Sequence, residues 1–341
     1  MSARPIIAID CMGGDVGPAI TVPAIFALRQ HADFLLCGDQ TRIDAQLRKH
    51  STAAGQTVIH APESISMSQG LRRILRDRRP TALRAALDAL ADNRADAVVS
   101  AADTGALMAL ARHRVGMLEQ VDRPAIAKEI IGKRGTFWMA DLGANTRCTP
   151  EQLLQFARMG VVAAQSLSDQ QAPRVALLNI GTEEGKGLNR LSVAGELLQS
   201  LPGMNFVGFI EGSRLFDNEA DVIVCEGFVG NVTLKAMEGT AAMAEHLLTE
   251  QLEATRGWQR WVLSMLRPTL RRVRGSLDTD KYNGAAFLGL RKVVVKSHGA
   301  ATQTAFTHAL QRAVEAVRGA VPQVIADGLG QNPAQPLTTF R

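Results

Sequence analysis

The stretch PIIAIDCMGGD, residues 5–15, decides how the chain begins to fold. Its apolar run predicts a β-strand, and the run leads into a turn that holds Gly13 and Gly14. In an open α/β sheet such a turn lies at the carboxyl end of the strand, where ligands bind. Because glycine lets the backbone approach an anion closely, this first turn is a candidate anion site.

The alternation of short apolar runs with amphipathic segments continues along the chain. It predicts strands at residues 5–10, 33–38, 57–61, 96–101, 136–142, 174–180, 204–210, 221–225 and 292–296. It predicts helices between many of them, including residues 18–31, 80–94, 150–167 and 229–253. This order indicates an α/β fold built on a parallel or mixed sheet.

The composition is typical of a globular protein with a large core. The 341 residues are 46% hydrophobic and include one Tyr, three Trp and eleven Phe, which favours helices packed on a sheet over a sandwich or barrel. The four Cys show no metal-ligand spacing and indicate buried thiols in a reducing compartment. The sequence has no signal-peptide pattern and no apolar run of about 18 residues, so we expect a cytoplasmic protein that does not span a membrane.

The formal net charge of +5 suits an acidic partner, which leaves nucleic acid, anionic lipid and an acidic carrier protein open. Basic runs at residues 71–79 and 256–274 permit nucleic-acid binding. However, the sequence lacks a known reader motif and aromatic side chains interleaved over a sheet. We therefore expect no nucleic-acid partner.

Five predicted strands run directly into glycine-containing turns, at residues 10–15, 100–105, 141–145, 179–186 and 226–231. A turn of this kind before a helix offers backbone N–H donors and a favourable dipole to a phosphate group. The sequence contains no GxGxxG, HExxH or GxSxG, and Gly187 stands where a Walker loop requires Ser or Thr. These patterns predict a phosphate site that uses no metal, no cofactor and no covalent nucleophile.

Ten motifs follow one another across nearly the whole chain: IAIDCMGGD, HAPE, DAVVSAADTGALMALA, DRPA, DLGAN, VALLNIGTEEGKG, FVGFIEG, ADVIVCEGFVGNVTLKAMEG, LGL and VVVKSHGAA. Together they resemble the bacterial phosphate acyltransferases of the PlsX family. The resemblance implies a three-layer α/β/α fold similar to isocitrate and isopropylmalate dehydrogenases and to phosphotransacetylase. It also implies a homodimer that transfers a fatty acyl group from acyl carrier protein to inorganic phosphate, giving an acyl phosphate for phospholipid synthesis.

Two departures from the family pattern are visible. Ala102 and Asp103 stand where family members usually have Gly-Asn. An ionised Asp103 close to the site would weaken phosphate binding unless a cation neutralised it. Residues 67–83 replace an acidic stretch followed by Ser-Ser, yet basic character is retained there by Arg72, Arg73, Arg76, Arg78 and Arg79.

Attack of phosphate on a thioester requires an oriented nucleophile and stabilisation of an oxyanion. Phosphate is itself nucleophilic and a thiolate leaves readily, so a strong general base is dispensable. The protein must supply orientation and preorganised positive potential away from water. Lys186, which ends a glycine-flanked turn, is the first catalytic candidate. Asn231, at a loop-to-helix junction, is the second, with a helix N-cap as its alternative role.

Other polar and glycine residues of the turns are candidates to bind phosphate or substrate. The cradle is expected to include Gly13, Gly14, Thr104, Gly105 and Asn145. Two residues that close the strand VVVKSHG could add charge or a donor, Lys296 and His298, although a histidine there is as often structural. The acidic residues of the turns are interpreted as acceptors that fix the loops, namely Asp10, Asp15 and Asp141.

Residues 254–275 break the α/β rhythm and predict a protruding amphipathic helical tip. Between residues 256 and 274 there are six Arg and no acid. One face gathers the predicted membrane-contact residues Trp258, Trp261, Val262, Met265 and Leu266. This pattern suits peripheral contact with an anionic membrane, where a membrane glycerol-3-phosphate acyltransferase would receive the product. Packing of the same face on a partner subunit is the alternative.

The tip belongs to a single predicted catalytic domain over residues 1–330, with a division into two lobes left open, and residues 331–341 are expected to form a flexible tail. A phosphotransacetylase-like enzyme that uses a short acyl group on coenzyme A is the main alternative function. The arginine-rich protrusion argues against it, since a small soluble thioester does not need one. A decarboxylating dehydrogenase lacks support from a cofactor fingerprint or an acidic metal cluster.

Overall fold

The computed structural model describes residues 4–50, 56–65, 70–168, 170–183, 185–254 and 279–330. Except for Ala254, the predicted tip at 254–275 lies outside the described residues, and so does the predicted tail at 331–341. The five predicted membrane-contact residues therefore also lie outside them: Trp258, Trp261, Val262, Met265 and Leu266.

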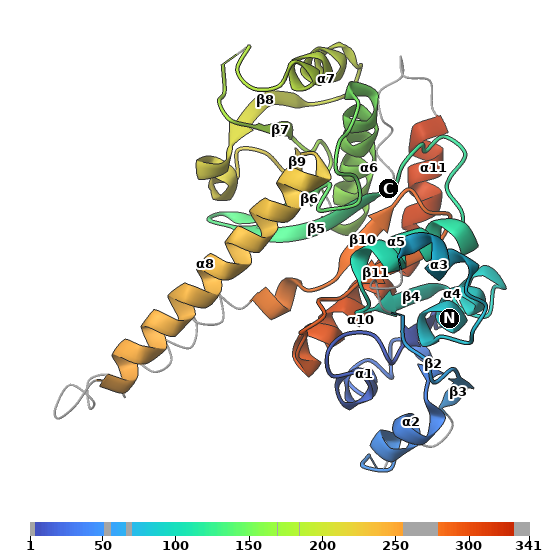
Figure 1. Ribbon diagram of the computed structural model, residues 1–341. Helices are drawn as coiled ribbons and strands as arrows, with labels where there is room; N and C mark the ends of the chain where they lie inside the picture. The colour runs from blue at the N-terminus through green and yellow to red at the C-terminus, as the bar shows by residue number, and fades with distance from the viewer. Residues whose placement is uncertain are drawn as a thin grey trace.

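One 11-stranded sheet runs through the whole described chain, in the order β3-β2-β1-β4-β11-β10-β5-β6-β9-β7-β8 (Figure 1). The strands are β1 (Ile6–Asp10), β2 (Asp33–Gly38), β3 (Thr57–His60), β4 (Ala97–Ser100), β5 (Ala125–Gly132), β6 (Gly135–Ala140), β7 (Val175–Asn179), β8 (Phe206–Glu211), β9 (Val222–Val224), β10 (Ala285–Leu288) and β11 (Val293–Lys296). Strand β10 is antiparallel to both of its neighbours, and β5 is antiparallel to β6. These antiparallel strands join two parallel halves into a single mixed sheet.

Helices cover both faces of the sheet. They are α1 (Pro18–Ile25), α2 (Gln40–Leu47), α3 (Leu71–Arg76), α4 (Ala82–Ala91), α5 (Thr104–Arg114), α6 (Pro150–Ser168), α7 (Asn189–Ser200), α8 (Gly227–Ala254), α10 (Gln303–Arg318) and α11 (Val321–Gly330), with 3-10 turns η2 (Gly212–Asp217) and η3 (Thr279–Tyr282). Successive residues of a strand point to opposite faces, so Ile7 packs in one apolar cluster and Ala8 in the other. The first cluster includes α1, α6 and α10, and the second includes α4 and α5. The predicted three-layer α/β/α fold is thus confirmed.

Sequence patterns located most of this sheet and missed part of its centre. The nine predicted strands are present, with ends that differ from the predicted ones by no more than two residues. Strands β5 and β10 were not predicted. The charged pair Lys128 and Glu129 interrupts the apolar run of β5. Helix α1 ends at Ile25, short of the predicted residue 31, and carries Pro23 inside it.

Helix α8 begins at the end of β9 and extends away from the body of the protein (Figure 1). It is 28 residues long, and its first turn is held by an N–H of Gly227 that donates to the Asn145 carbonyl at 2.8 Å. Along it, large apolar side chains are exposed at Phe228, Val229, Val232, Met243, Leu247, Leu248 and Leu252. Within the described ranges, no helix combines the length and apolar character needed to cross a membrane.

Two glycines of α8 allow a matched test of how tightly its first turn packs. A Cβ at Gly230 would lie 1.9 Å from the Asp141 carbonyl oxygen and 2.7 Å from the Cys225 Sγ, whereas a Cβ at Gly239 would meet nothing within 4 Å. We expect Gly230→Ala to destabilise the protein by about 1–3 kcal/mol or more, because backbone must move. Gly239→Ala should stabilise it by up to about 1 kcal/mol, since alanine is the better helix former. Urea denaturation of both variants measures this, and equal midpoints would contradict the packing described.

Candidate active site

A buried carboxylate fixes the turn after β1. The side chain of Asp10 accepts hydrogen bonds from the Met12 N–H at 3.2 Å, the Gly13 N–H at 3.0 Å and the Ser100 hydroxyl at 2.7 Å. Burial raises the pKa of Asp10, while the hydrogen bonds from Ser100 and the two amides oppose that rise. Asp10 therefore ties the glycine turn to the end of β4, and its predicted role in fixing the loop is confirmed.

Asp141 does the same at the end of β6. Its carboxylate is buried and accepts from the backbone N–H groups of Ile126, Ala144 and Asn145 at 2.7–3.1 Å. The Asn145 amide donates to the Pro124 carbonyl at 2.8 Å and to Asp141 at 2.9 Å. Asn145 was predicted to line the phosphate cradle, but it is only 4% exposed and its amide donates to Pro124 and Asp141 in the interior. It lines neither of the cavities described below.

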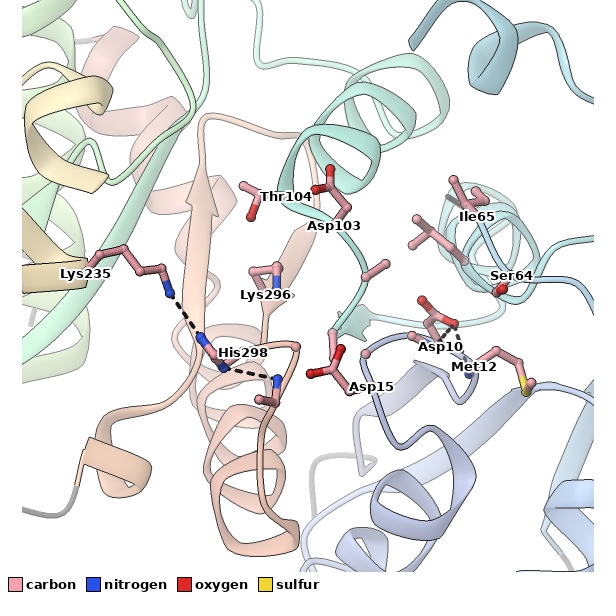
Figure 2. Close-up of a pocket in the computed structure, with 17 residues that line it drawn as sticks. Asp10, Met12, Asp15, Ser64, Ile65, Asp103, Thr104, Lys235, Lys296 and His298 are labelled. Atoms are coloured by element: carbon pink, nitrogen blue, oxygen red, sulfur yellow. Dashed lines mark hydrogen bonds between the residues drawn. The ribbon is translucent and has the colours of Figure 1, made fainter. Parts of the chain in front are cut away.

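A cavity of about 490 Å³ lies at the carboxyl ends of β1, β4 and β11 (Figure 2). This volume falls within the usual range for small-molecule sites, about 300–1,000 Å³. The polar and glycine residues that line it are Asp10, Gly13, Gly14, Asp15, Ser64, Asp103, Thr104, Lys235, Lys296, His298 and Gly299. The parallel strands bring together residues from the two ends of the chain, as predicted for turns at a common sheet edge.

The glycines of the first turn shape this cavity by close contact. A Cβ at Gly13 would lie 2.6 Å from an oxygen of Asp10 and 2.8 Å from the Ala102 nitrogen. Gly14 has a φ of 78°, and a Cβ there would lie 2.7 Å from the Gly299 carbonyl oxygen. Because the Gly13 N–H already donates to Asp10, it is not offered to a ligand. The two glycines instead let the turn pack closely against its neighbours.

The amino end of α5 faces the same cavity and is capped by an acid. Asp103 accepts from the Gly105 N–H at 2.8 Å and the Ala106 N–H at 3.0 Å. Gly105, predicted to bind phosphate, therefore donates its N–H to Asp103, and it does not line the cavity. Thr104, the first residue of the helix, does line it. The substitution of Asp for the family's Asn keeps the cap and adds a carboxylate to the wall.

Two lysines and a histidine form another wall of the cavity. Figure 2 shows Lys235, Lys296 and His298 on one side of the cavity, with Asp10 and Asp15 on the other. The pKa of Lys296 is lowered to about 8, chiefly by burial and in part by nearby Lys235, while three acids oppose the shift: Asp103, Asp10 and Glu238. The pKa of His298 is also lowered, first by burial and then by Lys235. Burial makes positive charge in this wall unfavourable, and a bound anion would offset that effect.

A smaller hollow of about 90 Å³ adjoins the cavity and shares Thr104, Lys235, Lys296 and His298 with it. Asn231 lines this hollow, and its amide donates to the Leu142 carbonyl at 3.2 Å. Lys128 and Glu238 line it as well. Burial lowers the pKa of Lys128, whereas Glu238 at 3.8 Å opposes that shift. The structure thus brings the predicted Asn231 to the edge of the predicted phosphate-binding residues.

Lys186 is placed elsewhere. It lies in the segment between β7 and α7, where its Nζ pairs with Glu183 at 2.6 Å and its side chain is 54% exposed. The Asn179 amide donates to its carbonyl at 2.8 Å. Lys186 lines neither the cavity nor the hollow, so the structure does not bring it together with Asn231, Lys296 and His298.

Sequence reasoning missed Lys235 and Lys128. Lys235 follows Asn231 by four residues, which places both on one face of a helix, and this spacing could have revealed it. Lys128 belongs to the unpredicted strand β5, so nothing in the pattern marked it. In the part of the chain that the structure describes, no three His, Cys, Asp or Glu side chains gather as metal ligands would.

Solved structures with similar folds define the class. A phosphotransacetylase from Streptococcus pyogenes matches with a TM-score of 0.62 at 15% identity, over 94% of this chain and 95% of that one. A branched-chain phosphotransacylase from Enterococcus faecalis V583 matches with a TM-score of 0.58 at 13% identity, over 92% and 99%. A 4-hydroxythreonine-4-phosphate dehydrogenase from Klebsiella pneumoniae reaches 0.51 at 12% identity, over 93% and 98%. The protein shares the fold of these phosphotransacetylases and dehydrogenases.

Sequence relatives identify the family within that class. Residues 6–324 match the family described as "Fatty acid synthesis protein". The phosphate acyltransferase of Stutzerimonas stutzeri (strain A1501) is 44% identical over 340 residues, which cover 97% of this chain and 94% of the relative. That of Shewanella sp. (strain MR-4) is 42% identical over 330 residues, covering 95% and 96%. The chain belongs to this family of phosphate acyltransferases and is an acyltransferase of fatty acid and phospholipid synthesis.

The low pKa of Lys296 predicts a pH limit on phosphate use. As pH rises through about 8, Lys296 loses its proton, so kcat/KM for phosphate should fall. In Asp103→Asn the helix cap is kept, but the carboxylate that raises the pKa of Lys296 is lost. That variant should move the limit to lower pH and, at pH 7, lower KM for phosphate by about two- to tenfold. Initial rates over pH 6–9.5 measure both effects, and superimposable profiles would contradict the coupling.

Proposed function

We propose that the protein transfers a fatty acyl group from the thioester of acyl carrier protein to inorganic phosphate, giving an acyl phosphate for phospholipid synthesis. The observation that carries this proposal is the cavity with a wall of Lys235, Lys296 and His298, in a chain that belongs to the phosphate acyltransferase family. Neutralising phosphate with lysines in a partly enclosed site is the form of catalysis that this chemistry requires.

The reaction proceeds by direct attack, without a covalent intermediate on the enzyme. A phosphate oxygen forms a bond to the thioester carbonyl carbon, and the carbonyl electrons move onto oxygen. When this oxyanion collapses, the carbon–sulfur bond breaks and the electron pair leaves on the thiolate, which then takes a proton from water. The enzyme contributes orientation and charge stabilisation.

Each role is assigned to a group with suitable chemistry. Lys296 and His298 bind phosphate, with Thr104 beside them. Asn231, whose amide lies in the adjoining hollow, donates to the carbonyl oxygen as negative charge develops there. Lys186 remains a proposed catalytic residue through the family resemblance, although its segment must move or a second copy must supply it.

The acidic carrier protein docks, in this proposal, on the arginines of α3 and the segment after it. Arg72, Arg73 and Arg76 lie exposed on α3, and the loop residues Ser64 and Ile65 line both the main cavity and a small hollow against Ile74 of that helix. Arg79 is engaged within the chain by ion pairs to Asp77 and Glu63, each at 2.6 Å. Arg78, in the segment after α3, is also exposed. A second candidate docking surface, made of Arg271, Arg272 and Arg274, lies outside the described residues.

We further propose a cytoplasmic homodimer that contacts the membrane peripherally. The seven exposed apolar side chains of α8 support the dimer, because so many large apolar side chains on one helix are usually covered by a partner. Membrane contact is assigned to the predicted tip at 254–275 and rests on its sequence pattern alone. Such contact would favour transfer of the acyl phosphate to a membrane glycerol-3-phosphate acyltransferase.

The choice of donor tests the proposal. Purified protein should release free carrier-protein thiol from long-chain acyl carrier protein only when phosphate is present, and at least about a hundredfold faster than it uses acetyl coenzyme A. Thiol release and acyl phosphate, trapped as its hydroxamate, are measured in parallel. Release without phosphate would indicate a thioesterase, and preference for acetyl coenzyme A would indicate a phosphotransacetylase.

Alanine substitutions test the two proposed catalytic residues. Asn231→Ala and Lys186→Ala should each lower kcat by about ten- to a hundredfold or more, the scale of losing a preorganised donor. Lys133→Ala is the control, since Lys133, in the hairpin between β5 and β6, is 71% exposed and pairs with Asp217. A folded variant with normal kcat at saturating substrates would remove that residue from the mechanism.

A further inference from the structure

We propose that Lys235 and His298 together hold one oxygen of the phosphate substrate, which makes Lys235 a phosphate-binding residue of the active site. This inference rests on the proposed function, because it takes inorganic phosphate as the ligand. Figure 2 shows the Lys235 side chain reaching from α8 toward the His298 ring, and both residues line the cavity. The distance from Lys235 Nζ to His298 Nε2 is 3.0 Å.

The protons of the histidine ring carry the inference. The backbone N–H of Ala300, which can only donate, points at His298 Nδ1 at 3.2 Å, so Nδ1 is the acceptor. A neutral imidazole then has its proton on Nε2, the atom that faces Lys235. A lysine ammonium also carries only donors. Two donors thus face each other, and an anionic oxygen that lies beside the pair, within hydrogen-bond distance of both nitrogens, would accept from both.

Beside Lys235, two lysines share one carboxylate. Glu238 is shared between two lysines, at 2.9 Å from Lys235 Nζ and 3.8 Å from Lys128 Nζ. Lys296 lines the same cavity and is partly buried, and Asp103 and Asp10 act on it as opposing charges. At the Lys235 end of the cavity one carboxylate therefore serves two ammonium groups, and an anion would add a second negative charge there.

The position of Lys235 also fits the chemistry. It lines both the main cavity and the adjoining hollow, and Asn231 precedes it by one helical turn. A phosphate held by Lys235 and His298 would lie beside the amide proposed to bind the thioester carbonyl. Nucleophile and electrophile are then positioned from one face of one helix.

A purely structural role for Lys235 would have a different signature. Its side chain is 52% exposed, and its ion pair with Glu238 spans three residues of the same helix. Exposed pairs of this kind contribute little to stability. Lys235→Met should therefore leave the fold and its melting temperature almost unchanged while it removes a charge from the cavity.

The test measures phosphate binding directly and then turnover. By isothermal titration with inorganic phosphate, Lys235→Met should raise Kd at least tenfold, and KM for phosphate should rise as much while kcat stays within about threefold of wild type. Lys133→Met, which removes one exposed positive charge far from the cavity, should change neither. An unchanged phosphate Kd in folded Lys235→Met, or a fall in kcat alone, overturns the assignment. Because titration requires no acyl donor, failure of the proposed acyl transfer would be recognised separately.

Histidine variants test the shared oxygen. His298→Gln retains a donor near the Nε2 position and should bind phosphate more tightly than His298→Ala. If one oxygen accepts from both side chains, Lys235→Met combined with His298→Ala should raise Kd by much less than the product of the two single effects. Multiplicative effects would show that the two residues bind separately, which would contradict the shared site. Should Lys235→Met fail to fold, Lys235→Gln provides the same measurement.

Discussion

The active-site edge depends on two buried carboxylates that satisfy backbone N–H groups. A tight turn at the end of a buried strand exposes amides that neither the sheet nor water can satisfy, and an unmet buried donor is costly. Asp10 meets this need after β1, and Asp141 meets it after β6. Each also holds a second element, since Asp10 receives the Ser100 hydroxyl of β4 and Asp141 receives an amide of β5. The same device therefore organises both halves of the sheet.

The antiparallel centre of the sheet explains how residues distant in sequence form one cavity. Strand β11 returns from the end of the chain to lie parallel to β4, which places Lys296 opposite Ser100. Strand β10 then connects β11 to β5, so Lys128 and the first turns of α8 are held near the same edge.

Most of the fold was predictable because long apolar runs and their turns are local signals. Nine strands and the three layers followed from such runs and from the family motifs, and the loop-fixing roles of Asp10 and Asp141 followed from their positions before glycine turns. The site was less predictable. The roles of Asn145 and Gly105 depend on which partner their donors reach, and that partner lies elsewhere in the fold for Asn145 and in the helix cap for Gly105. Lys235 was missed because it belongs to a long helix, and the residues that surround it in the cavity come from β11 and the turn after it.

Helix α8 is anchored at its first turn and extends away from the body of the protein (Figure 1). Its first turn packs against Asn145 and Asp141. At about 1.5 Å per residue, its 28 residues extend roughly 40 Å from that turn. Lys235 lies eight residues beyond Gly227, only about 12 Å along the helix. When the helix tilts about its first turn, Lys235 moves about one third as far as the distal end. A displacement of the distal end therefore moves the cavity residues much less. One continuous helix can thus extend from the body without loosening the geometry at its base.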